Sequence, residues 1–252
     1  MYMQNSKSLL FNLKLKLISF VFGLTALVCP SVTFAQQLIT TTTAVGTSKI
    51  WGKVDDIAIE GLVQGPSAAI TPLQVVCVFE YTENDIFKSP PALPASLNGM
   101  VHLDHDLKGI ITDIRKGGKF TGHALETLLI TPAPGAIGAK RLLLIGLGDR
   151  NKFTPELMIS VAGVAMQEAI RMGITSYAFA SDLKDAGIDS PTALVAGYIV
   201  KGAIEAYRIQ VYLKSKKMAT FKPINKISLL AGPSFFTVAG KGITEAIATL
   251  KR

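Results

Sequence analysis

Two short runs of apolar residues constrain the fold of this chain more than any other feature. Residues 73–79 read LQVVCVF, and residues 141–148 read RLLLIGLG. An uninterrupted apolar run of this length, rich in branched side chains, is typical of a strand buried in the interior. The second run ends in a pair of glycines, which indicates a tight turn. We therefore expect both runs to be core strands of a sheet.

The rest of the chain mostly alternates predicted strands with predicted helices. Further strands are predicted at residues 54–64, 125–130, 174–180, 208–213 and 226–231. Helices are predicted from Asp106, as N-cap, to about 116, and over 154–172, 190–207 and 238–251. Three prolines predict a loop over residues 82–100, because proline fits neither a helix interior nor a central strand. This order predicts a three-layer α/β fold with a mixed, largely parallel sheet.

The N-terminus has the pattern of an export signal. Lysines precede an apolar stretch over residues 17–28, and the first acidic residue is Asp55. Thr33 and Ala35 supply small residues at the positions before a cut ahead of Gln36. The pattern predicts that residues 1–35 are a signal peptide, that the protein is periplasmic or secreted, and that it meets the membrane only during export. An uncleaved anchor and a lipoprotein modified at Cys29 are the alternatives.

The charge and cysteine content exclude several classes of protein. The chain has 26 Lys and Arg against 18 Asp and Glu, and 49% of its residues are hydrophobic, which excludes a disordered charged tail. Two cysteines exclude a disulfide scaffold. The densest basic cluster, at Lys214, Lys216 and Lys217, is interpreted as a solvated loop, so nucleic-acid binding is not predicted. Residues 36–53 are predicted to be a weakly ordered lead-in to a single domain over residues 54–252.

The glycine pair after the second apolar run is a candidate phosphate-binding loop. Gly146, Leu147, Gly148 and Asp149 lie between a predicted strand and a predicted helix, where backbone N–H groups can hold a phosphate. A dinucleotide fingerprint would require glycine at position 151, where this chain has Asn151. The alternative is a tight turn that lets the strand and the helix pack.

A polar cluster at residues 102–106 is a weak candidate for metal binding. His102, Asp104, His105 and Asp106 offer metal-binding side chains, but an extended segment would turn His105 away from the others. A solvated loop that ends in an Asp N-cap is the favoured interpretation. Cys77 is interpreted as a small core residue. No catalytic residue, resident metal or cofactor is predicted, and the partner, whether a protein or a small ligand, is left open.

Several segments together resemble the N-terminal domain of the leucyl aminopeptidase, or cytosol aminopeptidase, family. These are a helix start at Leu107–Gly109, a Gly-x-Phe-x-Gly turn at Gly118–Gly122, the strand that ends at Gly146–Gly148, and residues 202–217. In the last segment Tyr207 and Lys214 match a Tyr-x-Phe-x-x-Tyr-Lys pattern, whereas positions 209 and 213 lack its aromatic residues. The resemblance covers about residues 55–250 and implies a macro-domain-like α/β fold.

The resemblance also implies what this sequence lacks. In the family, a C-terminal domain holds two metal ions, and its hallmark is an Asn-Thr-Asp-Ala-Glu-Gly-Arg-Leu stretch that does not occur in these 252 residues. The sequence stops inside what is predicted to be the helix leading to that domain. We therefore expect an exported, non-catalytic binding or peptidase-accessory module. ADP-ribose or nucleotide binding or hydrolysis is the alternative, and metal-dependent aminopeptidase activity is a less favoured third.

Overall fold

A computed structural model of the chain describes residues 42–88 and 93–251. All of these residues belong to one compact unit, Thr40–Arg252. The predicted signal peptide, residues 1–35, lies outside the described residues.

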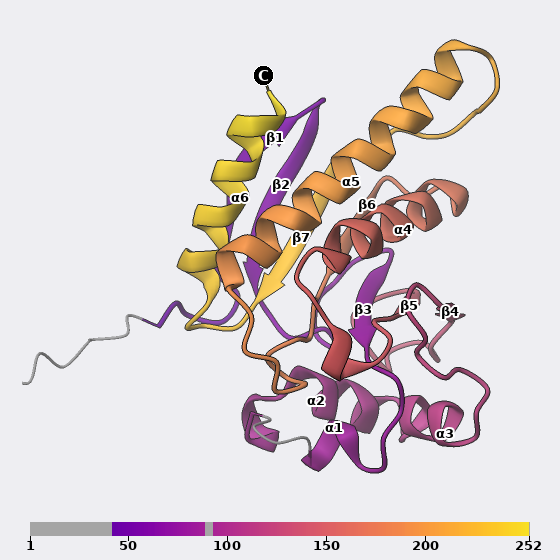
Figure 1. Cartoon of the computed structure of the whole chain (residues 1–252), viewed down its shortest axis with the longest axis vertical. Helices are drawn as coiled ribbons and strands as arrows, with labels where there is room; N and C mark the ends of the chain where they lie inside the picture. The colour runs from indigo at the N-terminus through magenta and orange to yellow at the C-terminus, as the bar shows by residue number, and fades with distance from the viewer. Residues whose placement is uncertain (1–41, 89–92, 252) are drawn as a thin grey trace, which may run out of the picture. The chain divides into compact units, whose positions relative to one another are not determined.

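Seven strands form one mixed sheet in the order β1-β2-β7-β6-β3-β5-β4 (Figure 1). The strands span Ser48–Val54, Ile57–Val63, Gln74–Val78, Thr127–Ile130, Leu142–Gly146, Ser176–Phe179 and Lys226–Ala231 for β1 to β7. The five inner strands run parallel, whereas β1 and β4 are antiparallel edge strands. The predicted fold class, α/β with a mixed and largely parallel sheet, is confirmed.

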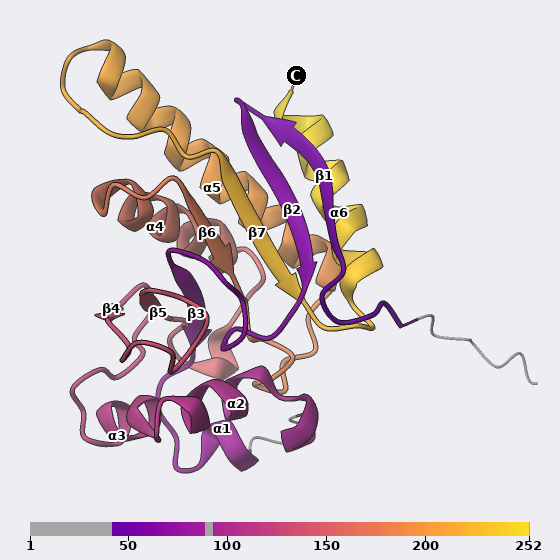
Figure 2. The ribbon, with the colours of Figure 1, turned by 180° about the vertical axis from the view of Figure 1, so that it is seen from behind.

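Helices pack on the two faces of this sheet. One face carries α4 (Leu157–Arg171), α5 (Thr192–Ser215) and α6 (Phe236–Leu250), which lie behind the strands in Figure 2. The other face, over β3 and β5, is covered by α1 (Asp85–Lys88), α2 (Gly99–Asp106) and α3 (Ile110–Lys116). Two short 3-10 turns, η1 (Ala95–Leu97) and η2 (Arg150–Lys152), complete the elements.

The two faces explain the two apolar runs of the sequence. In β3, Val75 and Cys77 contact the core under α4–α6, whereas Val76 and Val78 contact the second core, under α1–α3. The residues of β5 alternate between the same two cores. A parallel strand covered on both faces favours apolar side chains at nearly every position, and in β3 only Gln74 is polar. Both runs are therefore core strands, as predicted.

The predicted strand at residues 208–213 is wrong, because these residues continue α5 to Ser215. Their branched and aromatic side chains favour a strand locally. The preceding turns of α5 are buried through Ala203, Ala206 and Tyr207, and the helix continues from there. Tertiary packing thus overrides local propensity.

The predicted loop over residues 82–100 contains α1, η1 and the first residues of α2. Pro94 precedes η1 and takes no helical position, as expected for proline. The predicted N-cap at Asp106 is also wrong, because Asp106 ends α2. The side chain of Asp104 instead accepts from the N–H groups of Ile111 and Thr112, at 2.9 and 3.2 Å, in the first turn of α3.

Part of the predicted lead-in is ordered, since Ser48–Val54 forms β1 and pairs with β2. The two strands are joined by Asp55 and Asp56, whose φ angles are 49° and 65°. Two successive residues of positive φ form the tight hairpin turn that suits twisted antiparallel strands, and Asp tolerates this conformation. The Asp55-Asp56 pair is the sequence feature from which this hairpin, which was not predicted, could have been inferred.

Candidate functional site

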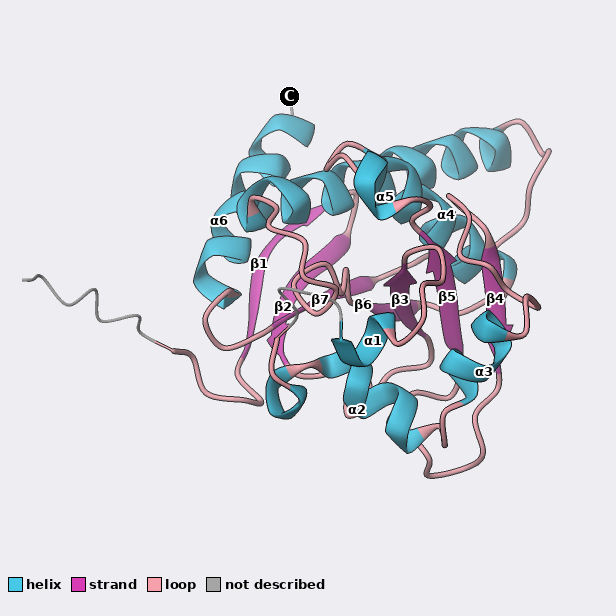
Figure 3. Cartoon of the chain, turned by 60° about the horizontal axis from the view of Figure 1, so that its bottom comes forward, coloured by secondary structure: helices cyan, strands magenta, loops and turns pink. Residues whose placement is uncertain are grey.

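A cavity of about 440 Å³ opens where three parallel strands end. It is bordered by Val63 at the end of β2, Phe179 at the end of β6 and Leu229–Ala231 of β7, and by the first turns of α5. Figure 3 brings this end of the sheet toward the viewer. The walls are largely apolar, and the apolar lining residues include Phe179, Leu183, Val195, Ile199, Leu229 and Phe235.

The connections of the strands explain why a cavity forms here. After β3 the chain turns to α1–α3 on one face, whereas after the neighbouring strand β6 it turns to α5 on the other face. Where two adjacent parallel strands send their connections to opposite faces, a crevice is left outside their carboxyl ends. Ligands of open α/β sheets bind in such crevices.

Two carboxyl groups follow β6 and line this cavity. Oδ2 of Asp182 accepts from the N–H of Cys77 at 3.1 Å, and Oδ2 of Asp185 accepts from the N–H of Met100 at 3.2 Å. The backbone oxygen of Asp185 accepts from Nδ2 of Asn98 at 3.0 Å, and Asn98 also caps α2. These contacts fix the loop after β6 against β3 and α2, so both carboxyl groups are held at the cavity.

Burial changes the ionisation of both groups. It raises the pKa of Asp185 to about 6, although the N–H groups at the start of α2 and the nearby His102 act in the opposite direction. Burial, together with the charge of Asp185, raises the pKa of Asp182 well above the ordinary value. Burial also raises the pKa of the Cys77 thiol, and Asp182 adds to this. Cys77 is buried and free, as expected for a core residue, and a thiol of raised pKa is a poor nucleophile.

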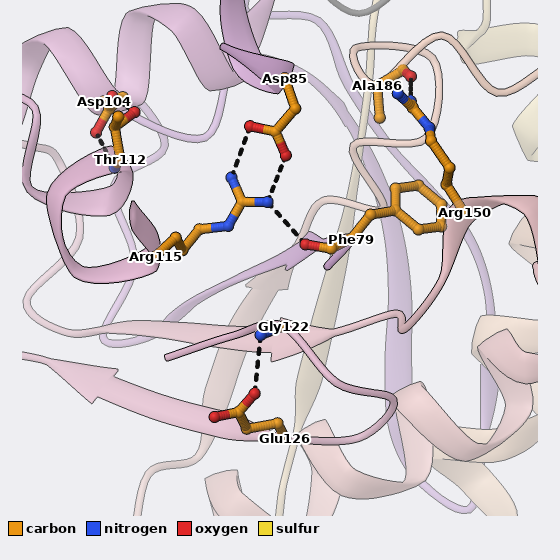
Figure 4. Close-up of polar contacts among 9 residues, drawn as sticks. All are labelled: Phe79, Asp85, Asp104, Thr112, Arg115, Gly122, Glu126, Arg150 and Ala186. Carbon is orange, nitrogen blue, oxygen red and sulfur yellow. Dashed lines mark hydrogen bonds and ion pairs between the residues drawn. The ribbon is translucent and has the colours of Figure 1, made fainter. Parts of the chain in front are cut away.

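A smaller cavity of about 30 Å³ lies beside the first and shares Asp182 and Asp185. Its opposite wall contains Arg115, which is 2% exposed and donates to Asp85 and to the backbone oxygen of Phe79 (Figure 4). Arg150, which also lines this cavity, donates to the backbone oxygen of Ala186, in the loop that carries Asp182 and Asp185. Arg115 thus joins α3 to α1 and to the residue after β3, and Arg150 joins η2 to the loop after β6.

The candidate phosphate loop uses its N–H groups within the protein. The N–H groups of Gly146, Leu147 and Gly148 donate to the backbone oxygens of Glu126, Val78 and Gly122 at 2.8, 2.8 and 2.9 Å.

A side chain at position 146 would also place its Cβ 2.0 Å from the backbone oxygen of His123. Asp149 starts η2, where its side chain accepts from the N–H of Asn151 at 2.9 Å. This geometry favours the tight turn, and a phosphate site at Gly146–Asp149 stays a prediction.

The four candidate metal ligands lie in α2 and do not converge. Asp104 is 1% exposed and caps α3, whereas the side chain of His105 is 86% exposed. His102 lines the large cavity. Over residues 42–88 and 93–251, no group of three or more His, Cys, Asp or Glu side chains is arranged to hold a metal ion.

Asp182 and Asp185 belong to no recognisable sequence motif and were not predicted as site residues. The available signal was weak: two carboxylates three residues apart, directly after a predicted strand. A search for polar residues after each predicted parallel strand would have found them, because ligand sites collect there.

Comparison with known proteins agrees with this architecture. Residues 75–217, more than half of the chain, match the N-terminal domain of the cytosol aminopeptidase family. The chain belongs to this family.

Two relatives of this chain are probable cytosol aminopeptidases. That of Roseiflexus castenholzii is 30% identical over 143 residues, which are 56% of this chain and 28% of that protein. That of Nitrosococcus oceani is 30% identical over 150 residues, which are 59% of this chain and 30% of that protein. The match thus spans less than a third of the length of either relative.

Solved structures show that this family member has a macro-domain-like fold. A mutant macrodomain of Oceanobacillus iheyensis superposes with a TM-score of 0.55 at 10% identity, over 81% of this chain and 95% of that one. A mutant tomato leucine aminopeptidase superposes with a TM-score of 0.54 at 17% identity, over 79% of this chain and 37% of that one. The family and the fold inferred from the sequence are both confirmed.

Proposed function

We propose that this chain is a non-catalytic, small-ligand-binding module that is exported from the cell. The observation that carries the proposal is the cavity of about 440 Å³ at the carboxyl ends of β2, β6 and β7. This volume lies within the range of small-molecule sites, which combine apolar walls with a few polar groups. The polar groups here are the two carboxyl groups of the loop after β6.

The walls and the carboxyl groups define the ligand that fits best. Phe179, Leu229 and Phe235 offer apolar surface to a flat or aliphatic body. Asp182 and Asp185 offer hydrogen-bond acceptors to an amino or amide group of the ligand. A nucleobase with an exocyclic amino group combines both features. A mutant Oceanobacillus iheyensis macrodomain with ADPR has the same fold, with a TM-score of 0.50 at 11% identity, which supports including ADP-ribose among the ligands.

A peptide ligand is the second candidate. The relatives are probable cytosol aminopeptidases, and the amino terminus of a short peptide would suit the same carboxyl groups. In that case the module would assist a separate peptidase.

The test is thermal melting of residues 36–252 with ADP-ribose, adenosine, nucleotides and short peptides. A ligand at 100 times its Kd adds about 2.7 kcal/mol to the free energy of unfolding. We expect stabilisation by a ligand with an amino-bearing aromatic group.

A pair of matched variants tells cavity binding from binding elsewhere. Ala68→Trp places a large ring at the rim of the cavity, and Ala133→Trp places the same ring at an exposed turn outside it. The first substitution should abolish the ligand-induced shift, and the second should preserve it. If no ligand of the panel raises the melting temperature, or if both variants respond like the wild type, the proposal fails.

A further inference from the structure

The C-terminal part of α5 extends beyond the two helices that flank it. Nη2 of Arg208 donates to the backbone oxygen of Leu250 at 2.8 Å, so α6 ends beside Arg208 while α5 continues to Ser215. The chain then loops back to β7. In Figure 1 this part of α5 and its loop project away from the sheet at the upper right. We call residues 209–223 the basic tip.

The basic tip carries positive charge without nearby negative charge. It contains four exposed lysines: Lys214, Lys216, Lys217 and Lys222. The sequence has no acidic residue between Glu205 and Glu245. Within the described part of the chain, none of these four lysines forms an ion pair with a carboxylate.

The cations at the base of the tip, unlike those of the tip itself, form ion pairs with carboxylates. Arg208 pairs with Asp55 at 2.6 Å and Lys226 pairs with Glu60 at 3.1 Å. The unpaired charge is thus concentrated at the outer end of α5 and its loop.

The same segment exposes large apolar side chains. Ile209, Tyr212 and Met218 are 56%, 61% and 76% exposed. Nζ of Lys216 lies 5.4 Å from the centre of the Tyr212 ring, so this ammonium group and this exposed ring are neighbours on the tip. Apolar side chains exposed to water are stabilised when another surface covers them. Several of them on one segment therefore indicate a binding surface.

We propose that the basic tip docks on an anionic phospholipid surface. The lysines would contact the phosphate groups, and Ile209, Tyr212 and Met218 would enter the boundary between headgroups and acyl chains. Lysine suits this position because its stem can lie along apolar surface while its ammonium stays with the headgroups. A nucleic acid would attract the lysines but would leave the Ile and Met side chains without apolar surroundings.

The position of the tip is compatible with an open cavity. The cavity contacts α5 between Thr192 and Ile199 and the tip begins at Ile209, so roughly 15 Å of helix separates them. A molecule docked by its tip would keep the cavity accessible to solvent. No helix in the described residues has the length and hydropathy required to span a bilayer, so the proposed contact is peripheral.

The test is flotation of residues 36–252 with vesicles of phosphatidylcholine containing 30% phosphatidylglycerol, compared with pure phosphatidylcholine. This piece contains the whole compact unit that begins at Thr40 and removes the apolar stretch at residues 17–28. We expect binding to the anionic vesicles only, and loss of binding in 0.5 M NaCl, because surface charges are screened at high salt.

Two pairs of variants separate the tip from overall charge and hydrophobicity. In the first pair, one variant has all four lysines of the tip replaced by Gln. Its control has four exposed lysines elsewhere replaced by Gln, namely Lys53, Lys119, Lys140 and Lys251. The tip variant should bind at least about a hundredfold more weakly, since each of the four lysines near an anionic surface contributes about a fivefold factor. The control should retain binding within about twofold. The second pair is I209S/M218S at the tip against I50S/I70S, and only the tip pair should weaken binding.

The proposal is overturned if the protein floats equally with neutral vesicles, or if the control lysine variant loses as much binding as the tip variant. It is also overturned if short duplex DNA is bound through the tip lysines while anionic vesicles are not. Circular dichroism of each variant checks that the fold is kept. Because ligand binding in the cavity is measured without vesicles, this result is independent of the proposed function.

Discussion

Asp185 lies in the loop after β6, where its carboxyl group is enclosed between the cavity and the first turn of α2. Its pKa is raised to about 6, mainly by burial. Between about pH 4 and pH 6 the folded protein therefore holds a proton that the unfolded chain has lost. The contribution of this proton to the free energy of unfolding therefore falls as pH rises through that window. At neutral pH, Asp185 is a partly buried carboxylate, which destabilises the folded state.

The variant Asp185→Asn should remove this cost. The side-chain oxygen of Asn can still accept from the N–H of Met100, so the loop contact is kept. We expect the variant to be more stable than the wild type by about 1 kcal/mol at pH 7.5 and by little at pH 4.5. Urea unfolding at the two pH values measures the difference. Asp189→Asn, at a fully exposed carboxylate, is the control and should show no such trend. A constant difference at both pH values would contradict the burial argument.

Gly146 shows how one residue can separate packing from ligand binding. A Cβ at this position would lie 2.0 Å from the backbone oxygen of His123, and backbone cannot easily move away. Gly146→Ala should therefore lower the free energy of unfolding by at least about 2 kcal/mol. Gly65→Ala, where no atom lies within 4 Å of the added carbon, should be nearly neutral. A Gly146→Ala protein of normal stability that has lost nucleotide binding would instead favour the phosphate loop.

At the scale of the elements, α5 is held between α4 and α6 by residues without side chains. A Cβ on Gly202 would lie 1.9 Å from the backbone oxygen of Ile159 in α4, and one on Gly242 of α6 would lie 1.8 Å from the backbone oxygen of Ala193 in α5. Helix backbones can approach this closely only where glycine removes the side chain. This contact buries the first half of α5 and leaves its second half to project.

Two glycines on the same helix interface should respond oppositely to substitution by alanine. Gly202→Ala has no room and should destabilise the protein by about 2–4 kcal/mol. A Cβ on Gly163 of α4 would lie 3.7 Å from the nearest atom, so Gly163→Ala should be neutral or stabilising by up to about 1 kcal/mol through helix propensity. Thermal unfolding of both variants decides this. Equal destabilisation would mean that the helices are not packed as described.

At the scale of the whole molecule, the chain combines a macro-domain-like fold with an N-terminal pattern that predicts export. The fold from β1 to α6 forms one unit, and residues 1–35 precede it in the sequence. If residues 1–35 direct export, their removal leaves the strands and helices intact, because every described element starts at or after Ser48.

Processing before Gln36 is a direct test of the proposed export. N-terminal sequencing of the protein recovered from the periplasm or medium should begin at Gln36. Ala35→Phe places a large residue at the cleavage position and should leave the precursor uncut, whereas Gln37→Phe, beyond the cut, should be processed. Recovery of the uncut chain from the cytoplasm in both variants and in the wild type would refute export.

The sequence alone determined the features that depend on local pattern. The continuous apolar runs identified β3 and β5, and the alternation of strands and helices identified the α/β class, because burial on both faces imposes its own composition. The order of the glycine turns and the helix around Tyr207 identified the family.

Tertiary structure alone decided the site and the surface. The cavity unites β2, β6, β7 and α5, whose residues are far apart in the chain, and no local pattern reports which strand ends are neighbours. Residues 208–213 became helix and not strand, since their conformation follows the buried turns before them. The lysines around residue 216 were visible in the sequence, but only the end of α6 beside Arg208 shows that they stand on a projection. The physical reason is the same in each case: local propensities are small, and packing between distant segments outweighs them.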